Sequence, residues 1–314
     1  MTEAEVVLFC ADLDATLPLF TGRLGFRLDS IFPADDPSVA TLSREGLRVR
    51  LERGAAAPAR VTPTGDAGRW VQGRAGMRYR DLIPDRLGGR VIASHIQIPD
   101  AGPVADYVHF HEVRFQMIYC HRGWVRVVYE DQGPPFVLHP GDCVLQPPGI
   151  RHRVLEAGEG TEVIEVSSPA QHVTYVEHEM QLPTGTERRD RLFGGQRFVR
   201  HEAASARWET GRRAGFEARD TGIGQATSGL AEVHVLRRRG PEATKGWSHD
   251  GELLFVFVLS GGATLRCEGR EEERLVEGDS YVVPAGVEHT WTGCDEGVEL
   301  LEVVVPHGSD QHPP

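Results

Sequence analysis

Three histidines and one glutamine stand at spacings that suit a single metal ion. His109 and His111 are two residues apart, Gln116 follows after a short bend, and His152 follows a proline–glycine turn. Residues two apart on a strand point to the same face, so His109 and His111 should share the interior of a barrel. Imidazole nitrogens bind divalent Fe, Mn, Ni, Cu, Co or Zn, and spacing does not choose among them. The sequence therefore predicts one divalent transition metal held by His109, His111, Gln116 and His152.

The fourth predicted ligand, Gln116, is a neutral amide. A glutamate beside three histidines would leave a divalent site with a net charge of about +1, whereas an amide leaves it at about +2. The metal should then be a stronger Lewis acid that lowers the pKa of bound water and favours an anionic, chelating substrate. Gln116 cannot serve as a carboxylate base. The base must be a group of the substrate, a metal hydroxide, or a nearby side chain such as His95 or Glu165.

Strand parity around these ligands predicts further pocket residues. The catalytic candidates are His95, Tyr107 and Glu165, and the substrate-binding candidates are Gln97, Arg114 and Cys120. For His95 and Tyr107, catalysis and plain barrel packing are equally good interpretations, and for Cys120 packing is favoured. Arg114 lies in the bend before Gln116, where it either meets a substrate carboxylate at the pocket mouth or faces solvent.

The stretch of residues 90–168 resembles the cupin superfamily. The pattern HxHx4Qx6G runs from His109 to Gly123, and Gx5PxGx2H runs from Gly141 to His152. The family usually has glutamate where Gln116 stands, and often asparagine at the position of Glu156. Some polyketide-cyclase and aminohydrolase cupins place a glutamine beside the metal's histidines. The resemblance implies a double-stranded β-helix, or jelly-roll, barrel with the metal inside it.

A second copy of the pattern lies nearer the C-terminus. The GDxxxxPxG segment recurs from Gly278 to Gly286, and the residues before it align when Gly261 is set against Gly123. In this copy Trp247 replaces the first histidine and Leu254 replaces the amide. The resemblance therefore implies a bicupin in which one barrel keeps the working site.

Two interpretations of the second copy follow. His249 and His289 remain, and Glu252 shares strand parity with Leu254, so they predict a two-histidine, one-carboxylate site. The favoured alternative is a metal-free barrel kept for structure or for an organic ligand between Trp247 and Trp291.

These residues must be positioned by a mainly β fold. We expect two tandem jelly-roll barrels, because short strands alternate with Gly, Pro and Asp turns from residue 90 onward, preceded by a small α+β module of order βαβββ. The expected boundaries are a half-module at 1–55, a linker at 56–78, a first barrel at 79–185, a connector at 186–228, a second barrel at 229–307 and a tail at 308–314.

The N-terminal module is expected to have strands at 5–10, 27–32, 38–43 and 47–52, with a helix that starts at Asp12 and ends near Gly25. This order, and an Asp-Leu…Arg-Leu-Gly-Phe signature, resemble half of a glyoxalase/bleomycin-resistance (vicinal oxygen chelate) module. The family's histidine and glutamate ligands fall at Glu5 and near Arg50. A docking or dimerisation module is therefore favoured over a chelate site completed by a partner.

Composition restricts the partners. The formal net charge of −12 argues against a nucleic-acid partner, and no apolar run reaches the length of a membrane span. The five cysteines are odd in number and never form a CxxC pair, which fits a reduced, cytoplasmic protein. We expect a small-molecule substrate, anionic or chelating, and a homodimer.

Three functions follow from these residues. The first is a dioxygenase-like oxidoreductase, in which a substrate with adjacent oxygens chelates the metal and O2 attacks the activated ligand. The second is a non-redox metal enzyme: a cyclase, aminohydrolase, lyase or isomerase. The third is a non-catalytic, small-molecule-binding or regulatory protein.

Overall fold

The protein divides into two compact units, Met1–Pro58 and Ala59–Pro314, which are described separately. In the computed structural model, the described residues are 5–10, 13–32, 39–53, 60–62, 70–240 and 246–306. Asp12 and the expected tail at 308–314 lie outside these ranges.

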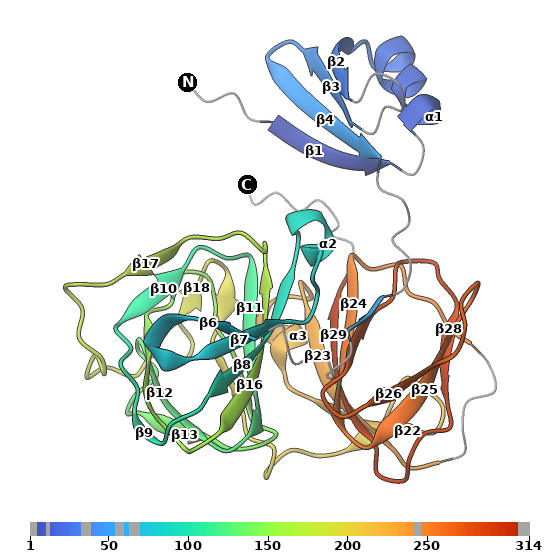
Figure 1. Ribbon diagram of the computed structural model, residues 1–314. Coiled ribbons are helices and arrows are strands. Elements are labelled where there is room, and N and C mark those ends of the chain that lie inside the picture. The colour runs from blue at the N-terminus through green and yellow to red at the C-terminus, as the bar shows by residue number, and fades with distance from the viewer. Residues whose placement is uncertain are drawn as a thin grey trace. The chain divides into compact units, whose positions relative to one another are not determined.

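The first unit is the expected βαβββ module. A helical segment, α1 (Leu13–Pro18) continued by the π-helix η1 (Leu19–Arg23), lies against one face of a four-stranded sheet of order β1-β4-β3-β2 (Figure 1). The strands are β1 (Glu5–Cys10), β2 (Arg27–Phe32), β3 (Val39–Arg44) and β4 (Leu47–Arg53). Val49 and Leu51 are buried while Arg50 between them is only partly so, which is the alternation that a one-sided sheet requires.

The second unit contains two jelly-roll barrels side by side, so the expected fold class is confirmed (Figure 1). The first barrel has a seven-stranded sheet of order β20-β14-β11-β16-β8-β7-β6 facing a sheet of order β13-β12-β15-β10-β17, with β9 beside β15. Its first sheet comprises β6 (Val71–Gln72), β7 (Arg78–Asp81), β8 (Ile92–Ile98), β11 (Phe115–Arg122), β14 (Cys143–Leu145), β16 (Thr161–Ser168) and β20 (Val199–His201). Its second comprises β9 (Gly102–Pro103), β10 (His109–His111), β12 (Val125–Tyr129), β13 (Phe136–Leu138), β15 (His152–Ala157) and β17 (Thr174–Val176).

The second barrel repeats this plan with a seven-stranded sheet of order β21-β22-β23-β29-β24-β27-β5 and a three-stranded sheet of order β26-β25-β28. The larger sheet comprises β5 (Arg60–Thr62), β21 (Glu209–Thr210), β22 (Phe216–Asp220), β23 (Glu232–Arg238), β24 (Leu253–Ser260), β27 (Ser280–Val282) and β29 (Glu299–Val305). The smaller comprises β25 (Gly262–Cys267), β26 (Glu273–Val276) and β28 (His289–Thr292). A separate pair, β18 (Leu192–Phe193) with β19 (Gln196–Arg197), and the short helices η3 (Arg74–Gly76), α2 (Arg86–Gly89) and α3 (Ile223–Ala226) complete the unit.

The segments expected to link the domains contribute strands. Within 56–78, β5 pairs with β27 of the second barrel and β6 pairs with β7 of the first. Within 186–228, β20 joins the first barrel while β21 and β22 join the second. The backbone groups of these segments are therefore hydrogen-bonded within the sheets. Because the segments are short and rich in turn residues, their sequences do not show this pairing.

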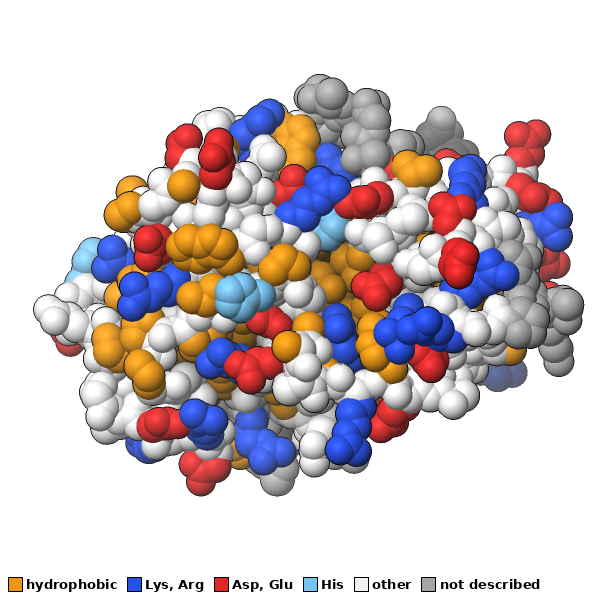
Figure 2. Space-filling view, turned by 90° about the horizontal axis from the view of Figure 1, so that it is seen from below, with side chains coloured by type: hydrophobic (Ala, Val, Ile, Leu, Met, Phe, Trp, Pro, Cys, Tyr) orange, Lys and Arg blue, Asp and Glu red, His pale blue; other side chains and the backbone are white. Residues whose placement is uncertain are grey.

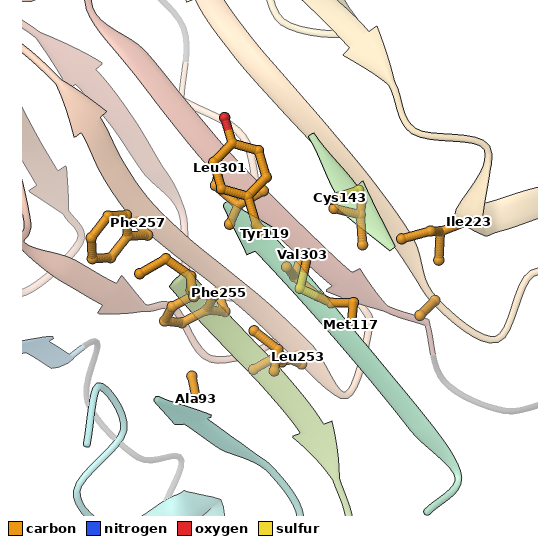
Figure 3. Packing of buried hydrophobic residues seen from close by; sticks show 14 of the residues in the cluster. Ala93, Met117, Tyr119, Cys143, Ile223, Leu253, Phe255, Phe257, Leu301 and Val303 are labelled. Carbon is orange, nitrogen blue, oxygen red and sulfur yellow. The ribbon is translucent and has the colours of Figure 1, made fainter. Parts of the chain in front are cut away.

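The largest apolar cluster lies between the two barrels. Met117 and Tyr119 of β11 pack with Phe255 and Phe257 of β24 and Leu301 of β29 (Figure 3). Successive residues of a strand point to opposite faces, so this contact uses the outward-facing residues of both large sheets. The alternate residues of β11 (Gln116, Ile118 and Cys120) consequently face the interior of the first barrel.

The same alternation corrects the placement of His95 and Gln97. Both were expected to line the metal pocket, but His95 packs edge-on against Phe257 of the second barrel, with ring centroids 5.5 Å apart. Its Nε2 lies 2.9 Å from Glu162 Oε2, and its Nδ1 lies 3.1 Å from an Arg80 nitrogen. Gln97, two residues along β8, accepts a hydrogen bond from Arg78. The pocket role of both residues was therefore wrong, because their strand presents this face to the neighbouring barrel.

His121, beside His95 in this interface, should make stability fall in acid. Burial, and then the neighbouring His95, lower the pKa of His121 from 6.5 to about 4. Between these values the unfolded chain binds a proton that the folded chain does not, so stability falls as the pH drops through this window. A His121→Gln variant should lose less stability than wild type between neutral pH and the lower value, as measured by urea unfolding. Equal losses of stability in both proteins would contradict the attribution of the acid sensitivity to His121.

Acidic and basic side chains are interspersed over the face shown in Figure 2, with no broad patch of one sign. Among the described residues, no helix is long and apolar enough to cross a membrane. All five cysteines are free thiols.

Candidate metal centre

The first barrel gathers three histidines at one point. Ligand atoms of His109, His111 and His152 all lie within 4.8 Å of one another, and they form the one such group of His, Cys, Asp or Glu found among the described residues. His109 of β10 stands directly opposite His152 of β15 in an antiparallel pair, and the ring centroids of His109 and His152 are 4.2 Å apart. The His-x-His spacing and the turn before His152 thus bring two neighbouring strands to a common set of imidazoles.

Hydrogen bonds donated to backbone carbonyl oxygens fix the orientation of two of these rings. His109 Nδ1 lies 2.8 Å from the Tyr107 carbonyl oxygen, and His152 Nδ1 lies 3.0 Å from that of Ile150. A carbonyl can only accept, so each Nδ1 must carry the proton and each Nε2 the lone pair. The Asp106 carboxylate, 3.7 Å from His109 Nδ1, increases the basicity of that ring. This is the tautomer that a metal ligand needs.

Gln116 carries a buried oxygen that suits a cation. Its Nε2 donates to Glu165 Oε1 at 3.2 Å, and because a carboxylate only accepts, the amide oxygen must point the other way. That Oε1 is buried and has no hydrogen-bond partner among the described residues. Ser167 Oγ also donates to Glu165, which holds the carboxylate in place. Three imidazoles and an oriented amide oxygen on the barrel interior therefore fit a divalent transition metal.

Tyr129 lies against the histidine cluster and was not predicted from the sequence. Its ring stacks on His152 with centroids 5.5 Å apart, and the side chain is buried. Burial, reinforced by the charge of Glu165, raises the pKa of the Tyr129 hydroxyl well above its usual range. Tyr129 shares parity with Val125 and Val127 on β12, so strand alternation would have placed it on the interior face.

Tyr107 and Cys120, which were also expected to line the pocket, make contacts that suit a packing or supporting role. Tyr107 supplies its carbonyl oxygen to His109, while its side chain is 40% exposed. Cys120 faces the interior but lies in the apolar cluster with Val125 and Leu138. Burial raises the pKa of Cys120 to about 12, so the thiol stays protonated at neutral pH. These surroundings favour packing for Cys120 and leave Tyr107 a backbone partner of the histidine.

Arg114 and Glu252, which were expected at two different sites, bind each other. The Arg114 guanidinium contacts both carboxylate oxygens of Glu252, the shorter contact being 2.8 Å. This ion pair joins the bend before β11 to the chain just before β24. The ion pair gives each side chain a partner of opposite charge that the sequence did not predict, and the roles of Arg114 in substrate binding and of Glu252 as a metal ligand stay predictions.

The second barrel does not reproduce the three-ligand cluster. His249 Nε2 lies 2.8 Å from the Val283 carbonyl oxygen, so that nitrogen carries a proton and cannot bind a metal. His289 Nδ1 lies 3.1 Å from the Val287 carbonyl oxygen, which repeats the arrangement of His152. His249, Glu252 and His289 do not form a group of ligand atoms among the described residues, and Glu252 is bound to Arg114, so the structure does not gather this expected site.

Thr174 of β17 should tune the affinity of the centre. Its hydroxyl lies 2.9 Å from His111 Nδ1, and nothing in the sequence signals this contact. Replacing an outer partner of a metal-bound histidine typically weakens affinity roughly 10- to 100-fold. Thr174→Val should therefore bind metal about tenfold more weakly in a competition titration with a chelator. Thr210→Val, at an exposed position on β21, is the control. Equal metal affinities for the two variants would contradict a role of Thr174 in supporting His111.

Comparison with protein families finds a match in each barrel. A model of the cupin domain matches residues 96–167 and 238–304, one segment in each barrel. No curated protein matches the chain.

Comparison with solved structures finds the same two-barrel fold. Oxalate decarboxylase from Bacillus subtilis at pH 4.6 matches with a TM-score of 0.56 at 14% identity, over 78% of this chain and 76% of that one. A putative glyoxylate-induced protein from Pseudomonas aeruginosa matches with a TM-score of 0.60 at 14% identity, over 82% and 93%. The 7S globulin of Momordica charantia matches with a TM-score of 0.52 at 11% identity, over 76% and 82%. At these identities the likeness concerns the fold alone.

Proposed function

We propose that the chain is a metal-dependent enzyme of the cupin superfamily, because a cupin-domain model matches a segment of each barrel and only the first barrel gathers three histidines among the described residues. One divalent transition metal would be held in the first barrel by His109, His111, His152 and Gln116. The substrate would be a small molecule with adjacent oxygens that chelates the metal, and the reaction would be dioxygenase-like. The cluster of three histidines, together with a buried Gln116 Oε1 that has no hydrogen-bond partner among the described residues, carries this proposal.

The residues of the pocket have separable tasks. Three backbone- or hydroxyl-anchored imidazoles and one neutral amide leave the charge of a bound cation uncompensated, so the pocket should select an anionic substrate. The metal, when bound, would supply Lewis acidity and activate the chelated substrate towards O2. Glu165 orients the Gln116 amide, and Tyr129 closes the pocket wall against His152.

The proposal is tested by anaerobic purification, loading with iron, and measurement of O2 uptake over a panel of catechols, β-diketones and enolic acids. Uptake that depends on iron and on one class of substrate supports it. Absence of uptake with iron, manganese, copper, nickel and cobalt overturns the dioxygenase-like reaction.

A non-redox metal enzyme is the second candidate, and Glu165 favours it. This carboxylate lies one hydrogen bond from Gln116 and is close to Tyr129, so a base is available where Gln116 itself cannot act as one. A cyclase, aminohydrolase, lyase or isomerase would need such a base. Turnover by zinc-loaded protein without oxygen would support this candidate, and loss of that turnover in Glu165→Gln would assign the base.

Gln116→Glu should reveal whether the amide binds the metal. A carboxylate at this position adds a negative charge, so metal affinity should rise about tenfold or more. The metal-free variant should be less stable, because two buried carboxylates would then face each other at Glu165. Gln116→Leu should instead lose affinity while remaining folded. Affinities equal to wild type in both variants would show that Gln116 is not a ligand.

We further propose that the N-terminal unit is a glyoxalase-like half-module that forms a homodimer in the cytoplasm. Val6, Leu8 and Ile31 of its sheet are exposed apolar residues, which suits an interface with a second copy. Sedimentation equilibrium of the full chain and of a Leu8→Glu variant tests this assembly. A wild-type monomer would overturn it.

A further inference from the structure

The second barrel preserves the backbone of the metal centre while changing its side chains. Trp247 and His289 form an antiparallel bridge with two backbone hydrogen bonds of 2.9 Å, as His109 and His152 stand opposite each other in the first barrel. Trp247 therefore occupies the position of a predicted metal-binding histidine, and His289 occupies that of His152.

Glu302 is the counterpart of Glu165. In the first barrel Glu165 stands opposite Ile118 on β11, and in the second Glu302 stands opposite Val256 on β24. Both carboxylates lie on the interior face of the last long strand. Glu165 holds the Gln116 amide, but Leu254 replaces that amide in the second barrel, so Glu302 needs a different partner.

Arg213 is that partner, and it reaches the interior from the irregular segment before β22. Its guanidinium carbon lies 3.9 Å from the ring centroid of Trp247 and 4.5 Å from that of Trp291, and the guanidinium is paired with Glu302. The Arg213 side chain is only 11% exposed. Burial lowers the pKa of Arg213 to about 10, so the group stays charged at neutral pH.

The guanidinium also lies close to the histidine that matches His152. The charge of Arg213 contributes, after burial and together with His249, to lowering the pKa of His289 to about 4, so His289 remains neutral. His289 Nε2, which corresponds to the metal-facing nitrogen of His152, is buried without a hydrogen-bond partner among the described residues. The interior of the second barrel therefore contains a positive charge from the side chain of Arg213, whereas the first barrel would obtain one from a bound metal.

We propose that the second barrel is a binding site for a planar organic cation of the guanidinium type, and that the tethered side chain of Arg213 occupies it where the first barrel would hold a metal. Trp247 and Trp291 bind the faces of the cation, since indole is the strongest aromatic partner for a guanidinium. Glu302 neutralises its charge. The same contacts anchor the segment around Arg213 to the barrel interior and keep metal ions out of it.

The test removes the tethered cation and supplies a free one. Arg213→Ala should lower the midpoint of thermal unfolding by about 5 °C or more, because Glu302 is left buried and unpaired. Millimolar methylguanidinium should restore the midpoint with saturation and change tryptophan fluorescence, whereas ammonium at the same ionic strength should not. Arg212→Ala, at the neighbouring exposed residue, should show neither the loss nor the rescue.

A second variant separates charge from shape. Arg213→Met fills the space without a charge, so it should also unfold at a lower temperature than wild type, and adding Glu302→Gln should recover part of the loss. A midpoint for Arg213→Met equal to wild type would overturn the proposal. So would rescue of Arg213→Ala by ammonium and methylguanidinium alike, or no rescue by either.

Discussion

Replacing His152 with alanine is expected to abolish specific metal binding. His152 is 6% exposed, its ring lies beside those of His109 and His111, and its Nδ1 is anchored to a backbone carbonyl. Loss of an outer partner of a ligand already costs roughly 10- to 100-fold in affinity, so loss of the ligand itself should exceed about 100-fold. Elemental analysis of the purified variant should find almost no bound metal, and any metal-dependent turnover should disappear with it.

The matched control is His139→Ala. His139 is exposed and lies outside the histidine group, so its removal should leave metal content and turnover unchanged. The two variants must also be compared by circular dichroism, because an unfolded His152→Ala protein would lose its metal for another reason. A folded His152→Ala protein with the metal content of wild type would contradict the assignment of this residue as a ligand.

Phe257→Ala is expected to destabilise the two-barrel unit by about 3–5 kcal/mol. Phe257 is fully buried in the cluster between the barrels (Figure 3). Its ring also contacts those of His95 and His121. Truncation to alanine leaves a cavity that rigid sheets on both sides cannot close. The loss is measured as the change in the free energy of unfolding by urea.

Two controls locate this effect. Val276→Ala, at a side chain that is 46% exposed, should change stability by less than about 0.5 kcal/mol. Because Phe257 packs on the outward face of the first barrel's sheet, metal affinity of Phe257→Ala should remain that of wild type. A stability loss as small as that of Val276→Ala would mean that this cluster does not hold the barrels together.

The fold was predictable because its signals are local. Alternation of Val49 and Leu51 with arginines marks a one-sided strand, and the GDxxxxPxG turns mark the two barrels in the same order. The histidine cluster was predictable for the same reason, since parity along β10 and a hydrogen-bonded pair with β15 suffice to bring the side chains together.

The errors arise where long-range contacts decide the placement of a side chain. The strand β8 is buried on both faces, so its hydrophobic pattern does not show which face is the barrel interior, and His95 was assigned to the wrong one. The ion pair of Arg114 with Glu252 joins residues far apart in sequence, and Arg213 enters the second barrel from a segment without periodicity. No local sequence pattern predicts the contact of His95 with the second barrel, the ion pair of Arg114 with Glu252, or the position of Arg213.

The metal content of the protein purified without chelators tests the central claim most directly. Elemental analysis with native mass spectrometry should find one divalent transition metal per chain, because the first barrel has the histidines and the second is filled by Arg213. Reconstitution with excess metal should not exceed this value. A chain that takes up no metal under any reconstitution, or that binds two, would contradict the account.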